Sequence, residues 1–322
     1  MRNLTTILMM LFSVNVFSSD VSSFFQYSDS TGECPKQNLS IQLNEQNLGD
    51  LNKPVAIALN SGIKHQETIE NDPRKVFKGR SDKEENHWMQ AVGKVELENF
   101  SDSNKGNTCS TSLVTEKRGQ DANIIVMAGH CLNDWLKKGQ SNKDAEVTFT
   151  TLDGKKVKRS FSSKDIVLNK YSSDHDDYAI IKLNQPVSRT EIKPLLVANQ
   201  RLGDIMLKNP NAELMSAGYH GDIDPKFGNK GKNLTYQKCR EAELYISQKF
   251  TGTTCVSYQG GSGSPLVVKV DREGPREQEE GNEYLFVGSL IGAGRDKHYI
   301  TQFASHGQFV YPLINAIRSN KP

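Results

Sequence analysis

Three short segments contain residue types that could together carry out nucleophilic catalysis. The segment "IIVMAGHC" is an apolar run that leads into His130, "DDYAIIKL" places Asp177 before an alternating run, and "GGSGSP" places Ser262 between glycines. A serine hydroxyl is a poor nucleophile at neutral pH, so a neighbouring base must accept its proton. An imidazole has a pKa suited to that task, and a carboxylate can fix its tautomer. If the fold brings the three segments together, they can perform acyl transfer.

Each segment also has an interpretation without chemistry. Six of the ten residues in "SYQGGSGSPL" are Gly or Ser, which is typical of a flexible linker, but the strand-like run 265–268 follows at once. His130, next to a cysteine, could be a buried structural histidine. The run "DHDD" (174–177) could suggest a metal site, yet one His beside three carboxylates without regular spacing is more typical of a solvated loop. Asp177 is preferred over Asp176 because it directly precedes the alternating run.

The elements that would have to position these residues are β-strands. From about Gln90 the chain contains short runs rich in Val, Ile, Tyr and Thr, bounded by Gly, Asn, Asp and Pro, which predicts an all-β sandwich or barrel. Apolar residues in "YPLINAIRSN" recur at helical spacing, which predicts one short C-terminal helix with its cationic end at Arg318. The strand-like runs are "QAVGKVEL", "CSTSLVT", "NIIVMAG", "AEVTFTT", "DIVL", "DYAIIKL", "AELMSAGY", "LTYQKC", "SPLVVKV", "YLFVGSLIGAG" and "YITQF".

The beginning of the sequence is typical of an exported precursor. Residues 1–19 have one positive charge, a short apolar segment and small residues at the end, which predicts a cleaved signal peptide rather than a membrane anchor. Residues 20–75 are polar and are predicted to form a pro-segment. It ends at the dibasic pair Arg74-Lys75, which resembles a processing site, although an ordinary charged loop fits the pair equally well. Residues 76–322 would then form the main folded domain.

The charge distribution argues against a nucleic-acid-binding protein, and the cysteine spacing argues against a metal-binding one. The 40 Lys and Arg residues nearly balance the 38 Asp and Glu residues and are interspersed with them, so no nucleic-acid partner is expected. The densest basic run, "KKVKR" (155–159), follows "TLDG" and fits a solvated hairpin arm. The five cysteines have no C-x-x-C spacing, so no metal site is predicted. In an exported protein, disulfides are the expected state of the cysteines.

Taken together, the blocks "CSTSLVT…IIVMAGHC", "DYAIIKL" and "GGSGSP" resemble the three signature blocks of trypsin-like (chymotrypsin-fold) serine proteases. The similarity is greatest to the bacterial branch that includes the glutamyl endopeptidases, because "SAGYHGD" is similar to that branch's "GYPGD" and "VYPLINAI" to its C-terminus. The resemblance extends from about Val76 to the end. It implies an all-β fold of two six-stranded antiparallel β-barrels with a short C-terminal helix.

The resemblance also implies roles for particular residues. Ser262 would be the nucleophile, His130 the general base and then acid, and Asp177 the residue that orients the imidazole. The backbone N–H groups of Gly260 and Ser262 would form the oxyanion hole. The implied disulfides are Cys109–Cys131 and Cys239–Cys255, with Cys34 left unpaired in the pro-segment.

The sequence departs from the animal trypsins at two places and from the glutamyl endopeptidases at a third. Gly261 occupies the position where those enzymes carry an Asp that pairs with the new N-terminus after activation. Val256 occupies the position of the Asp that selects basic side chains, and "VGSLIGAG" lacks the His with which glutamyl endopeptidases read acidic ones. The predicted substrate-binding residues are Val256, Ser257, Gly292 and Gly294, with a preference for a small or apolar side chain.

These features predict a secreted or periplasmic serine endopeptidase that forms an acyl-enzyme intermediate. It would act on proteins or peptides as a monomer, without a cofactor and without a membrane partner after signal removal. The main alternative is a non-catalytic trypsin-like homologue that binds a protein. An α/β-hydrolase esterase fits less well, because Ser264 stands where its G-x-S-x-G motif needs the second glycine.

Overall fold

The computed structural model describes residues 72–97, 108–137, 144–172, 176–222, 224–239, 245–246, 250–271, 282–293 and 301–320. All of them belong to one compact unit, Ile41–Pro322. The predicted signal peptide, most of the predicted pro-segment, Cys34 and Gly294 lie outside the described residues.

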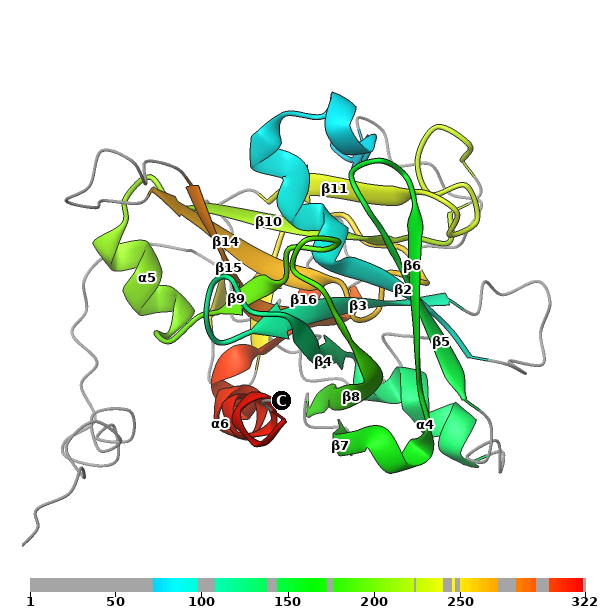
Figure 1. Cartoon of the computed structure of the whole chain (residues 1–322). Helices are drawn as coiled ribbons and strands as arrows, with labels where there is room; N and C mark the ends of the chain where they lie inside the picture. Colours follow the sequence, from blue (N-terminus) through cyan, green and yellow to red (C-terminus); the bar gives the residue numbers. More distant parts are fainter. Residues whose placement is uncertain are drawn as a thin grey trace, which may run out of the picture. The chain divides into compact units, whose positions relative to one another are not determined.

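The first half of the unit is a curled antiparallel sheet (Figure 1). Strand β3 pairs with β2 and β4, β4 pairs with β8, and β8 pairs with β7, while β2 continues through β5 to β6. Hydrogen bonds between Asn184 of β8 and Ser160 of β6 connect β8, the second strand from one end of this series, with β6 at the other end. The strands are β2 (Val92–Glu96), β3 (Thr108–Thr115), β4 (Ala122–Met127), β5 (Ala145–Thr150), β6 (Lys156–Phe161), β7 (Ile166–Tyr171) and β8 (Asp177–Val187).

The second half is built in the same way. Its strands pair antiparallel in the order β1-β11-β10-β14-β15-β16-β13-β12. Apolar side chains of β10, β11, β13, β14, β15 and β16 are buried and form the core of this half. The strands are β1 (Lys75–Val76), β10 (Glu213–Tyr219), β11 (Leu234–Lys238), β12 (Tyr245–Ile246), β13 (Phe250–Thr253), β14 (Pro265–Asp271), β15 (Asn282–Ala293) and β16 (Thr301–Ser305).

A short strand joins the two halves. Strand β9 (Leu195–Val197) pairs in parallel with β3 on one side and with β15 on the other, so the described strands form one 16-stranded sheet. The largest hydrophobic cluster also includes residues of both halves, among them Ile125 and Phe286. The predicted all-β double-barrel fold is confirmed, and β9 adds the parallel connection that the sequence analysis did not predict.

The predicted C-terminal helix is confirmed and is longer than expected. Helix α6 runs over His306–Ser319, with Phe309 and Leu313 fully buried. The ring of Phe309 lies 4.8 Å from that of Tyr178 on β8. At its C-terminal end, Arg318 forms an ion pair with Glu116 after β3. The ring of Phe309 also lies 6.1 Å from that of Phe286 on β15, so the helix packs against strands from both halves.

Several other short helices were not predicted. They are α4 (Gly129–Lys137), α5 (Leu202–Lys208), η1 (Gly79–Ser81), η2 (Glu84–Ala91) and η4 (Ser163–Asp165).

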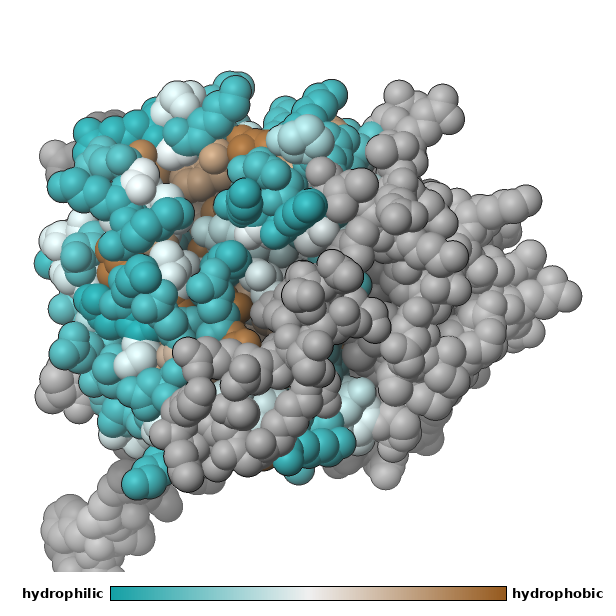
Figure 2. Space-filling model, turned by 90° about the vertical axis from the view of Figure 1, so that its right-hand side faces the viewer, coloured by the Kyte–Doolittle hydropathy of each residue, from teal (hydrophilic) through white to brown (hydrophobic). Residues whose placement is uncertain are grey.

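The basic run at 155–159 forms the expected hairpin arm. It lies on the turn and on β6, which pairs with β5, and Lys158 forms an exposed ion pair with Glu146 of β5. On the face that Figure 2 presents, the described residues are mostly hydrophilic, with hydrophobic residues visible in smaller areas. Within the described ranges, no helix is long and apolar enough to cross a membrane.

Candidate active site

His130 and Asp177 are in direct contact. Nδ1 of His130 lies 2.7 Å from Oδ2 of Asp177, and the backbone N–H of His130 donates to Oδ1 over 2.7 Å. His130 stands in the first turn of α4, directly after β4, and Asp177 is the first residue of β8, which pairs with β4. The Asp177 side chain is fully buried, whereas that of His130 is 15 % exposed. The carboxylate therefore holds one edge of an imidazole that stays partly exposed.

Ser262 lies in the turn between β13 and β14, which is hydrogen-bonded to β3, the neighbour of the strand that leads to His130. Its carbonyl oxygen accepts a hydrogen bond of 2.7 Å from the backbone N–H of Ser110 on β3. The preceding residue, Cys109, is bonded to Cys131, and both sulfurs lie within 4.8 Å of an imidazole nitrogen of His130. The predicted nucleophile and base thus belong to adjacent segments. The contact between Ser262 Oγ and His130 Nε2 stays a prediction.

The backbone of the Ser262 turn leaves two N–H groups available. The N–H of Gly261 donates to Tyr258 O over 3.0 Å, and that of Gly263 donates to Leu290 O over 2.7 Å. Within the described part of the chain, the N–H groups of Gly260 and Ser262 have no such partner. Gly260 has φ +93°, a left-handed conformation that residues with a side chain rarely adopt. Two unpaired donors two residues apart are what an oxyanion hole requires.

His220, which the sequence analysis did not select, is packed directly behind this turn. Its Nδ1 accepts a hydrogen bond of 3.2 Å from the backbone N–H of Tyr258. A Cβ atom at Gly261 would lie 2.5 Å from His220 Nδ1 and 2.6 Å from its Cε1. Position 261 is a glycine because the imidazole occupies the space that a side chain there would need. The resemblance of "SAGYHGD" to "GYPGD" could have directed attention to this histidine.

The environment of His220 keeps its imidazole neutral. Burial, together with the charge of Arg74, lowers the pKa of His220 to about 3. Burial also opposes the charged form of the neighbouring Asp222, but hydrogen bonds and charge from Arg74 outweigh it, and the pKa of Asp222 is lowered. Both groups therefore make the fold sensitive to acid.

We expect the free energy of unfolding to fall as the pH decreases below about 6.5. Unfolded chains protonate His220 near that pH, whereas the folded protein does so only near pH 3, so the unfolded state binds more protons in between. The loss from His220 is about 1.4 kcal/mol per pH unit in this window. Urea unfolding at pH 7.0 and 4.5 should show a loss about 2.5 kcal/mol smaller in His220→Asn, whose amide oxygen can accept the same hydrogen bond. Equal losses in both proteins would contradict this account.

Both predicted cysteine pairs lie at disulfide distance. The Cα atoms are 6.5 Å apart in Cys109–Cys131 and 4.8 Å apart in Cys239–Cys255. Among the described residues, the one group of side chains with metal-ligand geometry consists of His130 and the first pair. Since those two sulfurs are bonded to each other, they offer no thiolate for a metal.

The structure describes three of the four predicted substrate-binding residues. Val256 and Ser257 are buried, and the side-chain amide of Gln237 forms hydrogen bonds with both the N–H and the C=O of Val256. Gly292 is buried on β15, beside a register shift of its pairing with β16. Their role in substrate selection stays a prediction.

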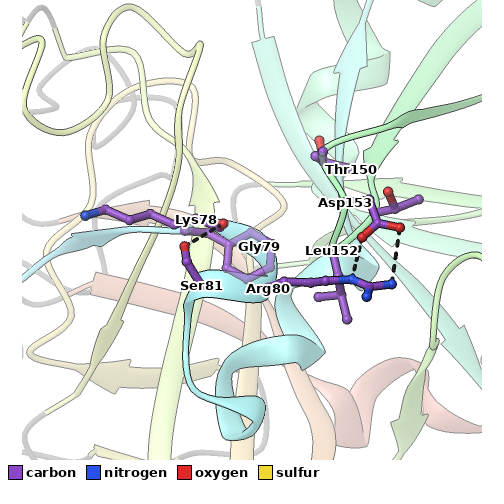
Figure 3. A pocket seen from close by; sticks show the side chains of 10 residues that line it. Lys78, Gly79, Arg80, Ser81, Thr150, Leu152 and Asp153 are labelled. Carbon is purple, nitrogen blue, oxygen red and sulfur yellow. Dashed lines mark hydrogen bonds and ion pairs between the residues drawn. The ribbon is translucent and has the colours of Figure 1, made fainter.

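A pocket of about 530 Å³ lies elsewhere, between η1 and the β5–β6 turn (Figure 3). It is lined by residues 77–81 and 150–154, and an ion pair of Arg80 with Asp153 lies in its wall. None of the predicted catalytic residues lines this pocket, so we assign it no catalytic part.

The family model described as Trypsin matches residues 94–274, which is more than half of the chain and includes His130, Asp177 and Ser262. No curated protein matches the sequence in a direct comparison. Membership of the glutamyl endopeptidase branch stays a prediction. The chain belongs to the trypsin family and is a trypsin-like serine protease with the double β-barrel fold.

Proposed function

We propose that the protein is an exported serine endopeptidase that hydrolyses peptide bonds through a Ser262–His130–Asp177 triad. The observation that carries the proposal is the buried Asp177 carboxylate, 2.7 Å from His130 Nδ1, beside a turn with two unpaired N–H groups. Structural histidines also pair with carboxylates, but they have no reason to lie in a segment adjacent to a turn with two available backbone donors. No observation favours the non-catalytic alternative.

The mechanism follows from the atoms involved. Nε2 of His130 accepts the proton of Ser262 as its Oγ attacks the substrate carbonyl carbon, while Asp177 stabilises the imidazolium. The developing oxyanion accepts hydrogen bonds from the N–H groups of Gly260 and Ser262. His130 then protonates the leaving amine, which gives the acyl-enzyme. A water molecule, deprotonated by His130, attacks the ester and releases the acid, and the proton returns to Ser262.

Export and synthesis as a precursor are part of the same proposal. The N-terminal pattern of residues 1–19 supports a signal peptide, and two cysteine pairs at disulfide distance support an oxidising compartment, either the periplasm or the exterior. Protein or peptide substrates follow from the protease family.

A fluorophosphonate probe tests the proposal directly. The probe phosphonylates a serine only where a base activates the hydroxyl, so it should label the native protein and not the urea-unfolded protein. Mass spectrometry of the digested adduct should locate the phosphonyl group on Ser262. Absence of labelling in correctly folded protein, after removal of any pro-segment, would support the non-catalytic alternative. Labelling of another serine would reject the assigned triad.

A further inference from the structure

Arg74, which we had placed at the end of the predicted pro-segment, is buried in the folded protein. Its side chain is 1 % exposed and its guanidinium contacts two carboxylates. It donates to Asp72 over 2.7 Å and to Asp222 over 2.8 Å, although Asp222 lies 148 residues further along the chain. The next residues form β1, which pairs with β11. Burying a guanidinium is unfavourable unless it is fully paired, so this arrangement needs an explanation.

The guanidinium also contacts the segment that leads into Ser262. Its Cζ lies 4.3 Å from the centre of the Tyr258 ring, within the range of a cation–π interaction. Asp222, its ion-pair partner, accepts a hydrogen bond from Gly228 N–H, which fixes the loop after β10. From the same loop, Gly221 N–H donates to Gln259 O over 2.7 Å. Arg74 therefore holds the residues that precede Gly260 in two ways, directly through the Tyr258 ring and indirectly through Asp222 and the loop after β10.

These contacts determine which way the backbone of the turn points. The carbonyl of Gln259 belongs to the same peptide group as the N–H of Gly260. Because Gly221 holds that carbonyl on the side of the β10 loop, the N–H of Gly260 points in the opposite direction. The Tyr258 N–H, held by His220, fixes the preceding peptide in the same way.

We propose that Arg74 is a positioning residue whose ion pair with Asp222 and contact with Tyr258 hold the oxyanion hole in its competent form. The inference rests on the proposed peptidase function. In the animal trypsins a new N-terminus pairs with an Asp directly before the nucleophile, but Gly261 has no carboxylate for such a pair. In this chain the guanidinium of Arg74 holds the turn in place instead. Residues 72–74 then belong to the mature enzyme, and processing occurs before Asp72 rather than between Lys75 and Val76.

Two variants of Arg74, produced as the full-length precursor and assayed after processing, test the positioning role. Arg74→Gln removes the charge and should lower kcat by about 10²-fold to 10³-fold, the usual effect of losing one oxyanion donor, with KM changed less than about threefold. Arg74→Lys keeps the charge without the planar fork and should recover at least about tenfold of that loss. Arg80→Gln, which removes an exposed ion pair with Asp153 from the same segment, is the matched control and should leave kcat unchanged.

Hydrogen exchange provides a readout that does not depend on activity. The hydrogen-bonded backbone amides within 257–262, those of Tyr258 and Gly261, should exchange at least about tenfold faster in Arg74→Gln than in the wild type, while those of β3 and β4 stay protected. If the wild type fails to react with the fluorophosphonate, the peptidase function is wrong, and the exchange result still decides whether Arg74 orders the turn. Unchanged exchange at 257–262, or unchanged kcat in an active protein, overturns the positioning role.

The position of processing supplies an independent test that needs no variant. N-terminal sequencing of purified, probe-reactive protein should give a start at or before Asp72. A start at Val76 in fully active protein would overturn the proposal, because Arg74 would then be absent from the mature chain. If Arg74→Gln does not fold, Asp222→Asn removes the partner charge and should give the same increase in exchange at 257–262.

Discussion

Replacing Ser262 with alanine should lower kcat for peptide hydrolysis by about 10⁶-fold, since the nucleophile of such a triad is worth that much. The remaining activity comes from donors that still bind the oxyanion and from substrate binding, which together give about 10³-fold to 10⁴-fold over the uncatalysed reaction. The substitution leaves the backbone contacts of the turn intact, because Ser110 bonds to the carbonyl of Ser262 and not to its hydroxyl. KM should therefore change little. Steady-state hydrolysis of a peptide library and fluorophosphonate labelling measure both effects.

Ser264→Ala is the matched control for this experiment. The Ser264 hydroxyl donates to Gly261 O over 2.6 Å, but the Ser264 N–H donates to the same oxygen over 2.9 Å. Losing the hydroxyl thus leaves that acceptor paired, and kcat should fall by less than about tenfold. Comparable losses in the two variants would show that the turn depends on serine hydroxyls for its structure and would remove the evidence for a nucleophile at 262.

Replacing Asp177 with asparagine should lower kcat by about 10⁴-fold at neutral pH. The carboxylate is fully buried and accepts only, so it favours the tautomer with a proton on Nδ1 of His130 and leaves Nε2 free to act as a base. In Asp177→Asn the oxygen can still accept the His130 backbone N–H, but the amide nitrogen then donates towards Nδ1. That contact favours the tautomer with the proton on Nε2, which cannot accept a proton from Ser262.

The neighbouring Asp176→Asn provides the control for Asp177→Asn. Asp176 contributes its backbone carbonyl to a hydrogen bond with Ser172 N–H, and the substitution keeps that carbonyl. Its kcat should stay within about threefold of the wild type, since surface substitutions away from the site have small effects. The pH profile of kcat/KM in both variants would separate a tautomer effect from unfolding. An Asp177→Asn enzyme with wild-type kcat would remove Asp177 from the mechanism.

The sequence was most informative where structure depends on short, regular patterns. Each of the eleven runs chosen for apolar alternation and bounding turn residues overlaps a strand, as "NIIVMAG" overlaps β4. The sequence analysis predicted the strand that precedes α4 but not α4 itself. Leu132, Trp135 and Leu136 have helical spacing and are mostly buried, so a helix could have been predicted there. The strand β9 has only three residues, and nothing in so short a run indicates pairing with two strands.

The sequence predicted those parts of the candidate site that lie within short local motifs. The pairing of His130 with Asp177 could be expected from the family blocks, because each residue stands at the end of a strand. The pairing of Arg74 with Asp222 could not, because it joins residues 148 positions apart in segments without periodicity. From the sequence, Arg74 and Lys75 looked like a dibasic processing signal. In the structure Arg74 is buried and Lys75 is exposed, and only folding separates their roles.

The packing of His220 against Gly261 also limits how this protein can diverge. An aspartate at 261, as animal trypsins have it, would overlap the imidazole, and an unpaired carboxylate would be buried beside it. A smaller residue at 220 would make room but would leave the Tyr258 N–H without its acceptor. Each substitution alone therefore destabilises the catalytic turn, whether it places an aspartate at 261 or a smaller residue at 220. Descendants of this chain can therefore acquire the N-terminus-dependent mode of activation only by changing both positions together. Variants with only one of the two changes would be less stable than either end point.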